Sequence, residues 1–84
     1  MEYVFSQHAL EQMHLRGISK TLVDSVLLKP DQLKEIDDLS AFQSICTNET
    51  GEFFLVRVFV NEHKNPNIIV TVYKTSKIQK YYEG

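Results

Sequence analysis

The chain has 84 residues, of which 43% are apolar and 24% are charged, and its formal net charge is −2. This length and composition fit one globular domain over residues 1–84 with an ordinary core. The apolar runs fall far short of the roughly 20 residues that a membrane helix needs, and the acidic balance argues against a uniformly basic nucleic-acid binder. A single cysteine excludes an intrachain disulfide, and we expect a cytoplasmic protein without a membrane segment.

Two short helices are expected at the start of the chain, in close succession. Ser6 and Ser19 are favourable N-caps, Gly17 suits the left-handed residue after a helix, and Pro30 stops the second helix. Apolar residues recur at helical spacing in both segments, so one face of each helix should be buried. These residues are Ala9, Leu10 and Met13 in the first helix and Leu22, Val23, Val26 and Leu27 in the second.

Four strands are expected after the helices: a short edge strand at 32–36, then 41–47, 52–61 and 68–75. The last two are rich in β-branched and aromatic residues, and turn-forming residues separate all four. This order of elements predicts an α+β fold. Two N-terminal helices would pack on one face of a three- to four-stranded antiparallel sheet.

Alternation along the strands assigns side chains to the two faces of this sheet. The helices should cover a face that consists of Phe54, Val56, Val58 and Val60 with Ile68, Val70 and Val72. The opposite, open face would carry Phe53, Leu55, Arg57 and Phe59 with Ile69, Thr71 and Tyr73. A cation, hydroxyl groups and aromatic rings on one open face suit a phosphate backbone and stacked bases.

Charge is distributed unevenly along the chain. Residues 1–50 contain four basic and eight acidic side chains, whereas residues 51–84 contain five basic and three acidic ones. Lys74, Lys77 and Lys80 follow one another without an intervening acid. These lysines can contact phosphate or only solubilise the end of the sheet, and the acidic stretch 31–38 can attract a basic partner or only form a solvated face.

Two segments carry a resemblance to a known family. Residues 8–19 read H-A-x-x-x-M-x-x-R-G-I-S, and residues 71–76 read T-V-Y-K-T-S. With a short N-terminal strand before them, they make the chain resemble an uncharacterised family of small bacterial and phage domains, close in fold to the BrnT and RelE/ParE toxins. The resemblance implies a ribonuclease site of a helix-one histidine, a basic residue and strand hydroxyls, which His8, Arg16, Thr71 and Tyr73 match here. The chain departs from the family pattern at Gln12, where an arginine is expected.

We therefore expect a toxin-like, metal-independent endoribonuclease. His8, Arg57 and Tyr73 are the expected catalytic residues, with His8 as the proton shuttle because an imidazole exchanges protons near neutral pH. Each residue also has a purely structural interpretation: Arg16 can cap helix carbonyls, and Arg57 can pair with Glu52. The residues expected to bind the RNA are Arg16, Thr71, Lys74 and Lys77.

The expected partners are RNA, with ribosome-bound mRNA as one form, and a cognate antitoxin protein; a homodimer is left open. No metal or other cofactor is expected, because His8 and His14 would lie about 240° apart on a helix and Cys46 and His63 stand alone. Two alternatives remain. One is a non-catalytic protein-interaction module of the same fold, which the acidic balance and Gln12 favour, and the other is a gyrase-directed ParE-like poison, which needs no catalytic histidine.

Overall fold

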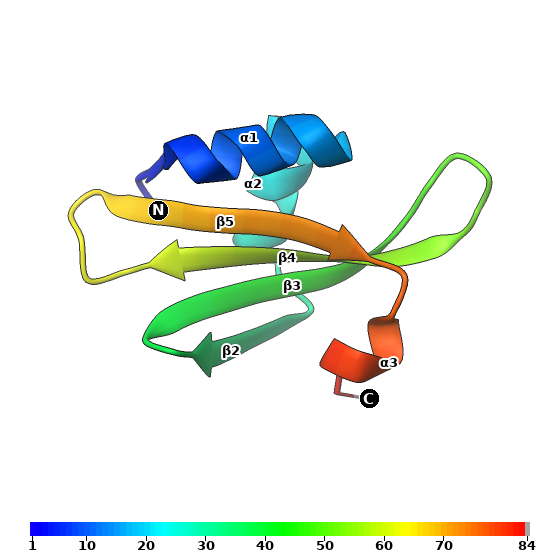
Figure 1. Ribbon diagram of the computed structural model, residues 1–84. Coiled ribbons are helices and arrows are strands. Elements are labelled where there is room, and N and C mark those ends of the chain that lie inside the picture. The colour runs from blue at the N-terminus through cyan, green and yellow to red at the C-terminus, as the bar shows by residue number, and fades with distance from the viewer. Residues whose placement is uncertain (84) are drawn as a thin grey trace.

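The computed structural model describes residues 1–83, which form a five-stranded sheet and three helices (Figure 1). In chain order the elements are β1 (Tyr3–Phe5), α1 (Gln7–Arg16), α2 (Lys20–Leu28), β2 (Gln32–Ile36), β3 (Leu39–Thr47), β4 (Phe53–Asn61), β5 (Asn67–Thr75) and α3 (Ile78–Tyr81). The order of strands in the sheet is β1-β5-β4-β3-β2. The expected α+β class is confirmed.

The predicted sheet of three to four antiparallel strands is wrong in one respect. Strands β2 to β5 form an antiparallel meander, as expected, but β1 pairs in parallel with β5 and makes the sheet mixed. The pairing joins residues more than sixty positions apart, such as Val4 and Ile68. A third helix, α3, follows β5 and was also absent from the prediction.

The first two helices begin and end where the capping residues predict. The hydroxyl of Ser6 accepts a hydrogen bond from the Ala9 amide at 3.0 Å, and the hydroxyl of Ser19 accepts one from the Leu22 amide at 3.1 Å. Gly17 has a φ of 63°, the left-handed conformation that ends a helix at little cost for glycine. Local sequence thus accounts for both helices.

The turn between β2 and β3 consists of Asp37 and Asp38. Both residues have positive φ, 51° and 65°, and Ile36 pairs with Leu39 across the turn. A two-residue hairpin turn with two left-handed residues matches the right-handed twist of the strands, although asparagine and glycine are its usual residues. The turn gives β2 its register on β3.

Helices α1 and α2 lie on the same side of the sheet, and α3 lies on the other (Figure 1). The fully or nearly buried core lies under α1 and α2, as the valine alternation predicts. It contains Ala9, Met13, Ile18, Val23, Val26, Leu27, Phe42, Val56, Val58, Val60, Ile69 and Val72. Leu10 was expected in this core, but it is 46% exposed.

A bulge in β5 changes the predicted faces of that strand. Phe59 pairs with Thr71 but Val60 pairs with Ile69, so Val70 has no residue opposite it. Ile69 is therefore fully buried in the core under the helices, and its predicted place on the opposite face is wrong. The same shift removes Ile68 and Val70 from the predicted core, because an inserted residue reverses the alternation on one side of it.

The hydroxyl of Ser6 binds the backbone of β5 at the bulge. It donates to the Val70 carbonyl at 2.8 Å, and the Ser6 amide donates to the Ile69 carbonyl at 2.9 Å. The residue that begins α1 thus also binds the bulged part of β5. Among residues 1–83, no helix is both long and apolar enough to cross a lipid bilayer.

Candidate functional site

Four polar side chains form a row across the sheet on the face opposite α1 and α2. Gln32, Gln43, Arg57 and Tyr73 lie directly opposite one another on β2, β3, β4 and β5. Gln43 Nε2 donates to Gln32 Oε1 at 2.7 Å, Arg57 Nε donates to Gln43 Oε1 at 2.9 Å, and Arg57 Nη1 donates to the Tyr73 hydroxyl at 2.5 Å. We refer to these four residues as the polar row.

Arg57 is the central residue of the polar row and is only 5% exposed. Among residues 1–83 it forms no ion pair with an acidic side chain. Three aromatic rings surround its guanidinium, with the Cζ atom 5.0 Å from the ring centroid of Phe59, 5.6 Å from that of Tyr73 and 4.5 Å from that of Tyr81. Burying a cation is costly unless hydrogen bonds and an anion compensate it.

The guanidinium of Arg57 retains hydrogen-bonding capacity. Of its five N–H groups, one on Nε and one on Nη1 donate to residues within the described chain. The other three have no acceptor among residues 1–83. A carboxylate or a phosphate can accept hydrogen bonds from two adjacent N–H groups of one guanidinium. The site can therefore bind an anion.

Gln43 holds the guanidinium in place from the neighbouring strand. Its side chain is fully buried, and its Nε2 group donates to the Tyr81 carbonyl at 3.1 Å as well as to Gln32. Both amide hydrogens are therefore in use, and the amide oxygen faces Arg57. This arrangement fixes the orientation of the amide, because the reverse orientation would place an N–H group against a cation.

Tyr73 receives a hydrogen bond from Arg57 and keeps its own hydroxyl proton available. Its ring stacks on Phe59 at a centroid distance of 6.0 Å and an interplanar angle of 15°. The guanidinium of Arg16, at the end of α1, lies 5.9 Å from the Tyr73 ring centroid. Two arginines thus lie close to one tyrosine, and both can contribute positive potential to a ligand there.

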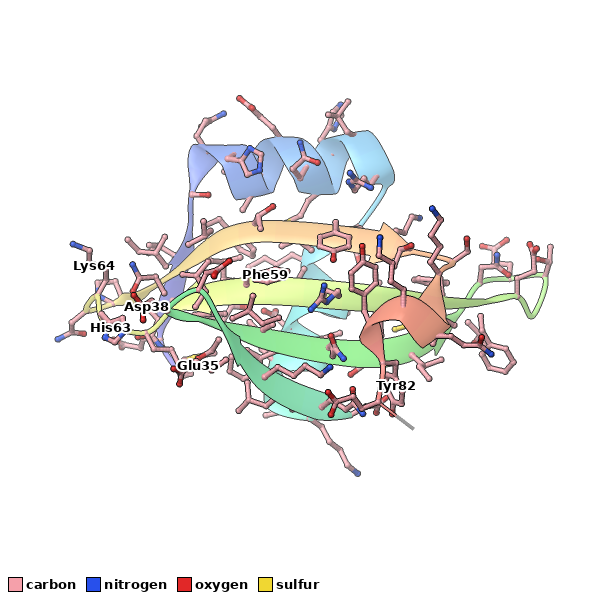
Figure 2. All side chains as sticks on the ribbon, turned by 60° about the horizontal axis from the view of Figure 1, so that its bottom comes forward. Glu35, Asp38, Phe59, His63, Lys64 and Tyr82 are labelled. Carbon is pink, nitrogen blue, oxygen red and sulfur yellow. The ribbon has the colours of Figure 1, made fainter. Side chains whose placement is uncertain are left out.

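The face that was expected to be open is partly covered. The Tyr81 ring, on α3, lies over Arg57, and the Tyr81 carbonyl accepts a hydrogen bond from Lys34 Nζ at 3.0 Å. Lys34 Nζ also forms an ion pair with Glu83 at 3.1 Å. Figure 2 shows this face of the sheet, with Phe59 in its middle and Tyr82 near α3. The expectation of an open face is therefore wrong at Arg57.

Of two other residues of the predicted site, Thr71 lies next to the polar row and His8 lies apart from it. Thr71 pairs with Phe59, so it belongs to the adjacent row on the same face. The side chain of His8 is exposed in the first turn of α1 and makes no hydrogen bond within the described residues. Eight residues of helix separate it from Arg16, or about 12 Å along the helix axis. His8 and Arg16 therefore lie at opposite ends of α1.

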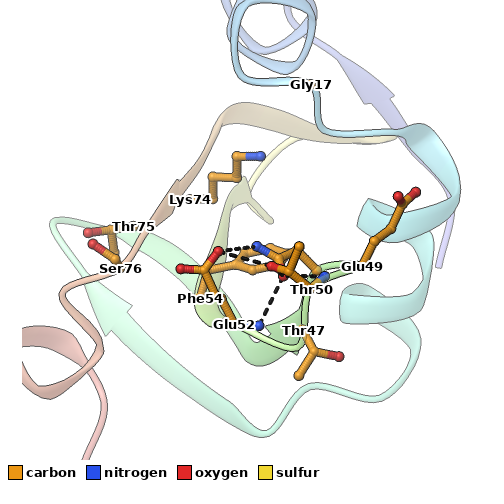
Figure 3. Close-up of a pocket in the computed structure, with 10 residues that line it drawn as sticks. Gly17, Thr47, Glu49, Thr50, Glu52, Phe54, Lys74, Thr75 and Ser76 are labelled. Carbon is orange, nitrogen blue, oxygen red and sulfur yellow. Dashed lines mark hydrogen bonds between the residues drawn. The ribbon is translucent and has the colours of Figure 1, made fainter.

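Lys74 and Lys77, which were expected to bind RNA, do not join the polar row. Lys74 pairs with Val56 and so points to the same side as the helices, where its Nζ lies 5.5 Å from the Phe54 ring centroid. It lines an open groove between the end of α1 and the β3–β4 hairpin, which also contains Glu49 and Glu52 (Figure 3). Lys77 is exposed between β5 and α3. The two acids make this groove less favourable for a phosphate than the polar row.

Sequence reasoning missed the residues that support Arg57: Gln32, Lys34, Gln43 and Tyr81. Gln43 lies inside the predicted strand 41–47 and pairs with Arg57 on β4, so the two side chains share a face of the sheet. An alignment of the two predicted strands as a hairpin would have indicated this pair. Tyr81 is held by tertiary contacts and gives no such signal. Across residues 1–83, no group of three or more His, Cys, Asp or Glu side chains is arranged to hold a metal ion.

Comparison with known proteins places the chain in a family. Searches of curated proteins and of solved structures found no match. A family model matches residues 5–74, which extend from the end of β1 to the penultimate residue of β5 and include Arg57 and Tyr73. The match leaves out α3. The chain therefore belongs to the family described as a domain of unknown function (DUF4258).

Proposed function

We propose that the protein is a toxin-type, metal-independent endoribonuclease that binds single-stranded RNA at the polar row. The observation that carries this proposal is Arg57, a nearly buried guanidinium that has hydrogen-bonded neighbours on both sides but no acidic partner among residues 1–83. A phosphodiester would supply the missing negative charge. Phe59 and Tyr73 beside the guanidinium would offer ring faces to the bases.

The chemistry of RNA cleavage without a metal ion needs a base, an acid and a cation. The base removes the proton from the 2′-hydroxyl, the acid protonates the leaving 5′-oxygen, and the cation stabilises the charge that develops on the phosphorus oxygens. In the proposed site, Arg57 is the cation, assisted by Arg16. Tyr73 is the acid, because its hydroxyl accepts from Arg57 and keeps its own proton for donation.

His8 is the proposed base. It is the histidine that the resemblance to the BrnT and RelE/ParE toxins indicates, and its imidazole is accessible to a ligand. Arg16 lies near Tyr73, whereas His8 lies at the other end of α1, about 12 Å away along the helix axis. The role of His8 is therefore tested separately from that of Arg57 and Tyr73.

Cleavage of RNA by the purified protein in the presence of EDTA tests the proposal. We expect Arg57→Gln and Tyr73→Phe to lower the rate by about a hundredfold or more, because each removes a group that acts in the transition state. Tyr73→Phe keeps the ring that stacks on Phe59 and removes only the hydroxyl. Circular dichroism and thermal unfolding of each variant check that the fold is intact.

His14→Ala is the matched control for His8→Ala, since both histidines are exposed on α1. His8→Ala should lower the rate, and His14→Ala should leave it unchanged. If His8→Ala retains full activity while Arg57→Gln does not, the base is another group. If the folded wild-type protein cleaves no RNA and its induced expression leaves host growth normal, the ribonuclease proposal is wrong.

A second candidate function is a non-catalytic protein-interaction module. The exposed side of α1 supports it, because Leu10 and Leu15 are 46% and 76% exposed and, with His14, line a shallow groove. Both leucines line the same groove, and a contiguous exposed apolar patch can mark a protein-binding surface. In this case Leu15→Ser would weaken binding of a protein partner, and the folded wild-type protein would cleave no RNA. For the toxin-type ribonuclease proposed above, the same surface would be the binding site of a cognate antitoxin.

A further inference from the structure

The segment after β5 contacts the polar row and its neighbour Lys34 through groups that resemble parts of a nucleotide. The Tyr81 ring lies 4.5 Å from the Arg57 Cζ atom, as a stacked base would. The Tyr81 carbonyl accepts hydrogen bonds from Gln43 and Lys34, and the Glu83 carboxylate forms an ion pair with Lys34 at 3.1 Å. An aromatic ring followed by oxygen acceptors and an anion thus occupies the site.

Gln32 completes the contacts of this segment. Its side-chain amide accepts a hydrogen bond from the Glu83 amide at 3.2 Å and donates one to the Glu83 carbonyl. The side chain of Gln32 thus bonds both the N–H and the C=O group of Glu83, as the backbone of a neighbouring strand would. The last residues of the described chain are therefore attached to side chains of the polar row.

The segment has little other structure to hold it. Helix α3 is a single turn of four residues, it has no side-chain N-cap and none of its residues is buried. The Glu83 side chain is 81% exposed, and exposed ion pairs of this kind contribute at most about 1 kcal/mol. The matched family region ends at residue 74, so this segment lies outside it. A ligand with a stronger anion can displace such a segment.

We infer that residues 78–83 are an internal ligand of the polar row, and that single-stranded RNA competes with them for Arg57, Gln43 and Lys34. This inference rests on the proposed function and adds the regulation of its site. The nucleotide that binds would stack its base on Arg57 in place of Tyr81 and would place its phosphate near Lys34 in place of Glu83. The free protein is then partly self-inhibited.

Variants in the full chain test the competition with a short 2′-O-methyl oligoribonucleotide, which binds but cannot be cleaved. Glu83→Gln should lower the Kd about two- to fivefold, since it removes an exposed ion pair from the free state. Tyr81→Ala should lower it by up to about tenfold, since it also removes the cation–π contact with Arg57. Fluorescence anisotropy measures the Kd at constant salt.

Two controls separate competition from simpler effects. Glu2→Gln makes the same change in net charge at an exposed residue of the N-terminal end, and it should leave the Kd nearly unchanged. Tyr82→Ala removes the neighbouring aromatic side chain, which is not one of the three rings in cation–π contact with Arg57, and it should leave the Kd nearly unchanged. Thermal unfolding of all variants shows whether a changed Kd reflects damage to the fold.

Displacement of the segment is measured directly with Tyr81→Trp, because the chain contains no tryptophan. We expect acrylamide to quench the indole fluorescence more strongly when the oligonucleotide is present. Tight RNA binding that is equal in wild type, Glu83→Gln and Tyr81→Ala, with no change in quenching, would overturn the internal-ligand inference and leave the RNA site standing. Absence of RNA binding in every folded variant would overturn both.

Discussion

Arg57 Nε donates to Gln43 Oε1 at 2.9 Å, and the two residues lie directly opposite each other on β4 and β3. Gln43 is fully buried and uses both of its amide hydrogens in bonds to Gln32 and Tyr81. The amide therefore has one orientation, and the guanidinium beside it has one position. A buried hydrogen-bonded network of this kind makes its members dependent on one another.

Replacing Gln43 should destabilise the protein strongly. In Gln43→Leu, Arg57 Nε loses its acceptor while the cation stays buried, so we expect the free energy of unfolding to fall by about 2–4 kcal/mol. Urea denaturation measures this change. Gln79→Leu, at an exposed position of α3, is the control and should change stability by no more than about 0.5 kcal/mol. A loss below about 1 kcal/mol in Gln43→Leu would mean that the network is not rigid.

The two N-cap serines should differ in their contributions to stability. Ser19→Ala removes one cap bond, and we expect it to cost about 1 kcal/mol. Ser6→Ala removes a cap bond and also the bond to the Val70 carbonyl in the bulge, so it should cost about 2 kcal/mol. Thermal or urea unfolding of the two variants side by side measures the difference. Equal losses would show that the Ser6 hydroxyl does not stabilise the bulge.

The β2–β3 turn offers a stabilising substitution. Asp38 has a φ of 65°, a conformation that is strained for an L-residue. Asp38→Gly removes this strain from the folded state, but it also raises the conformational entropy of the unfolded chain, which partly offsets the gain in stability. We expect a net gain of about 0.5 kcal/mol in the free energy of unfolding. Asp38→Ala should have the opposite sign, because alanine tolerates this conformation less well than aspartate. A stabilising Asp38→Ala would contradict the left-handed turn.

Cys46 should react slowly with alkylating reagents. Burial, and to a lesser degree the nearby Asp31 carboxylate, raises the pKa of its thiol above the ordinary value. Iodoacetamide at pH 8 should therefore modify the folded protein more slowly than the urea-unfolded chain, since the thiolate is the reactive form. Asp31→Asn keeps an oxygen acceptor for the Ile45 amide and removes the charge, so it should accelerate the reaction in the folded state only.

The same shift has a consequence for stability at high pH. The pKa of the Cys46 thiol is higher in the folded than in the unfolded state. The thiol's contribution to the free energy of unfolding is therefore fully present at pH values below the unfolded-state pKa. The contribution is lost as the pH rises through the folded pKa. Cys46→Ser removes the titrating thiol, so the free energy of unfolding of this variant should fall less steeply with rising pH than that of the wild-type protein. Urea denaturation at several alkaline pH values measures both.

Local sequence determined the elements that depend on neighbouring residues. The serine caps, Gly17 and the periodic apolar residues define α1 and α2, and alternation with turn residues defines β2 to β5 within two residues of the predicted bounds. The shared face of Arg57, Phe59, Thr71 and Tyr73 was also predictable, because these residues lie on one side of the bulge. Each of these features is encoded within a few positions along the chain.

Tertiary structure alone decided the remaining features, because their partners are far apart in sequence. The parallel pairing of β1 with β5 and the bulge at Val70 depend on contacts between the N-terminal residues and the last strand. The polar row depends on the register of four strands, and the burial of Arg57 depends on Tyr81, which α3 brings over it. A side chain's parity shows which face it occupies, but only the packed chain decides what covers that face.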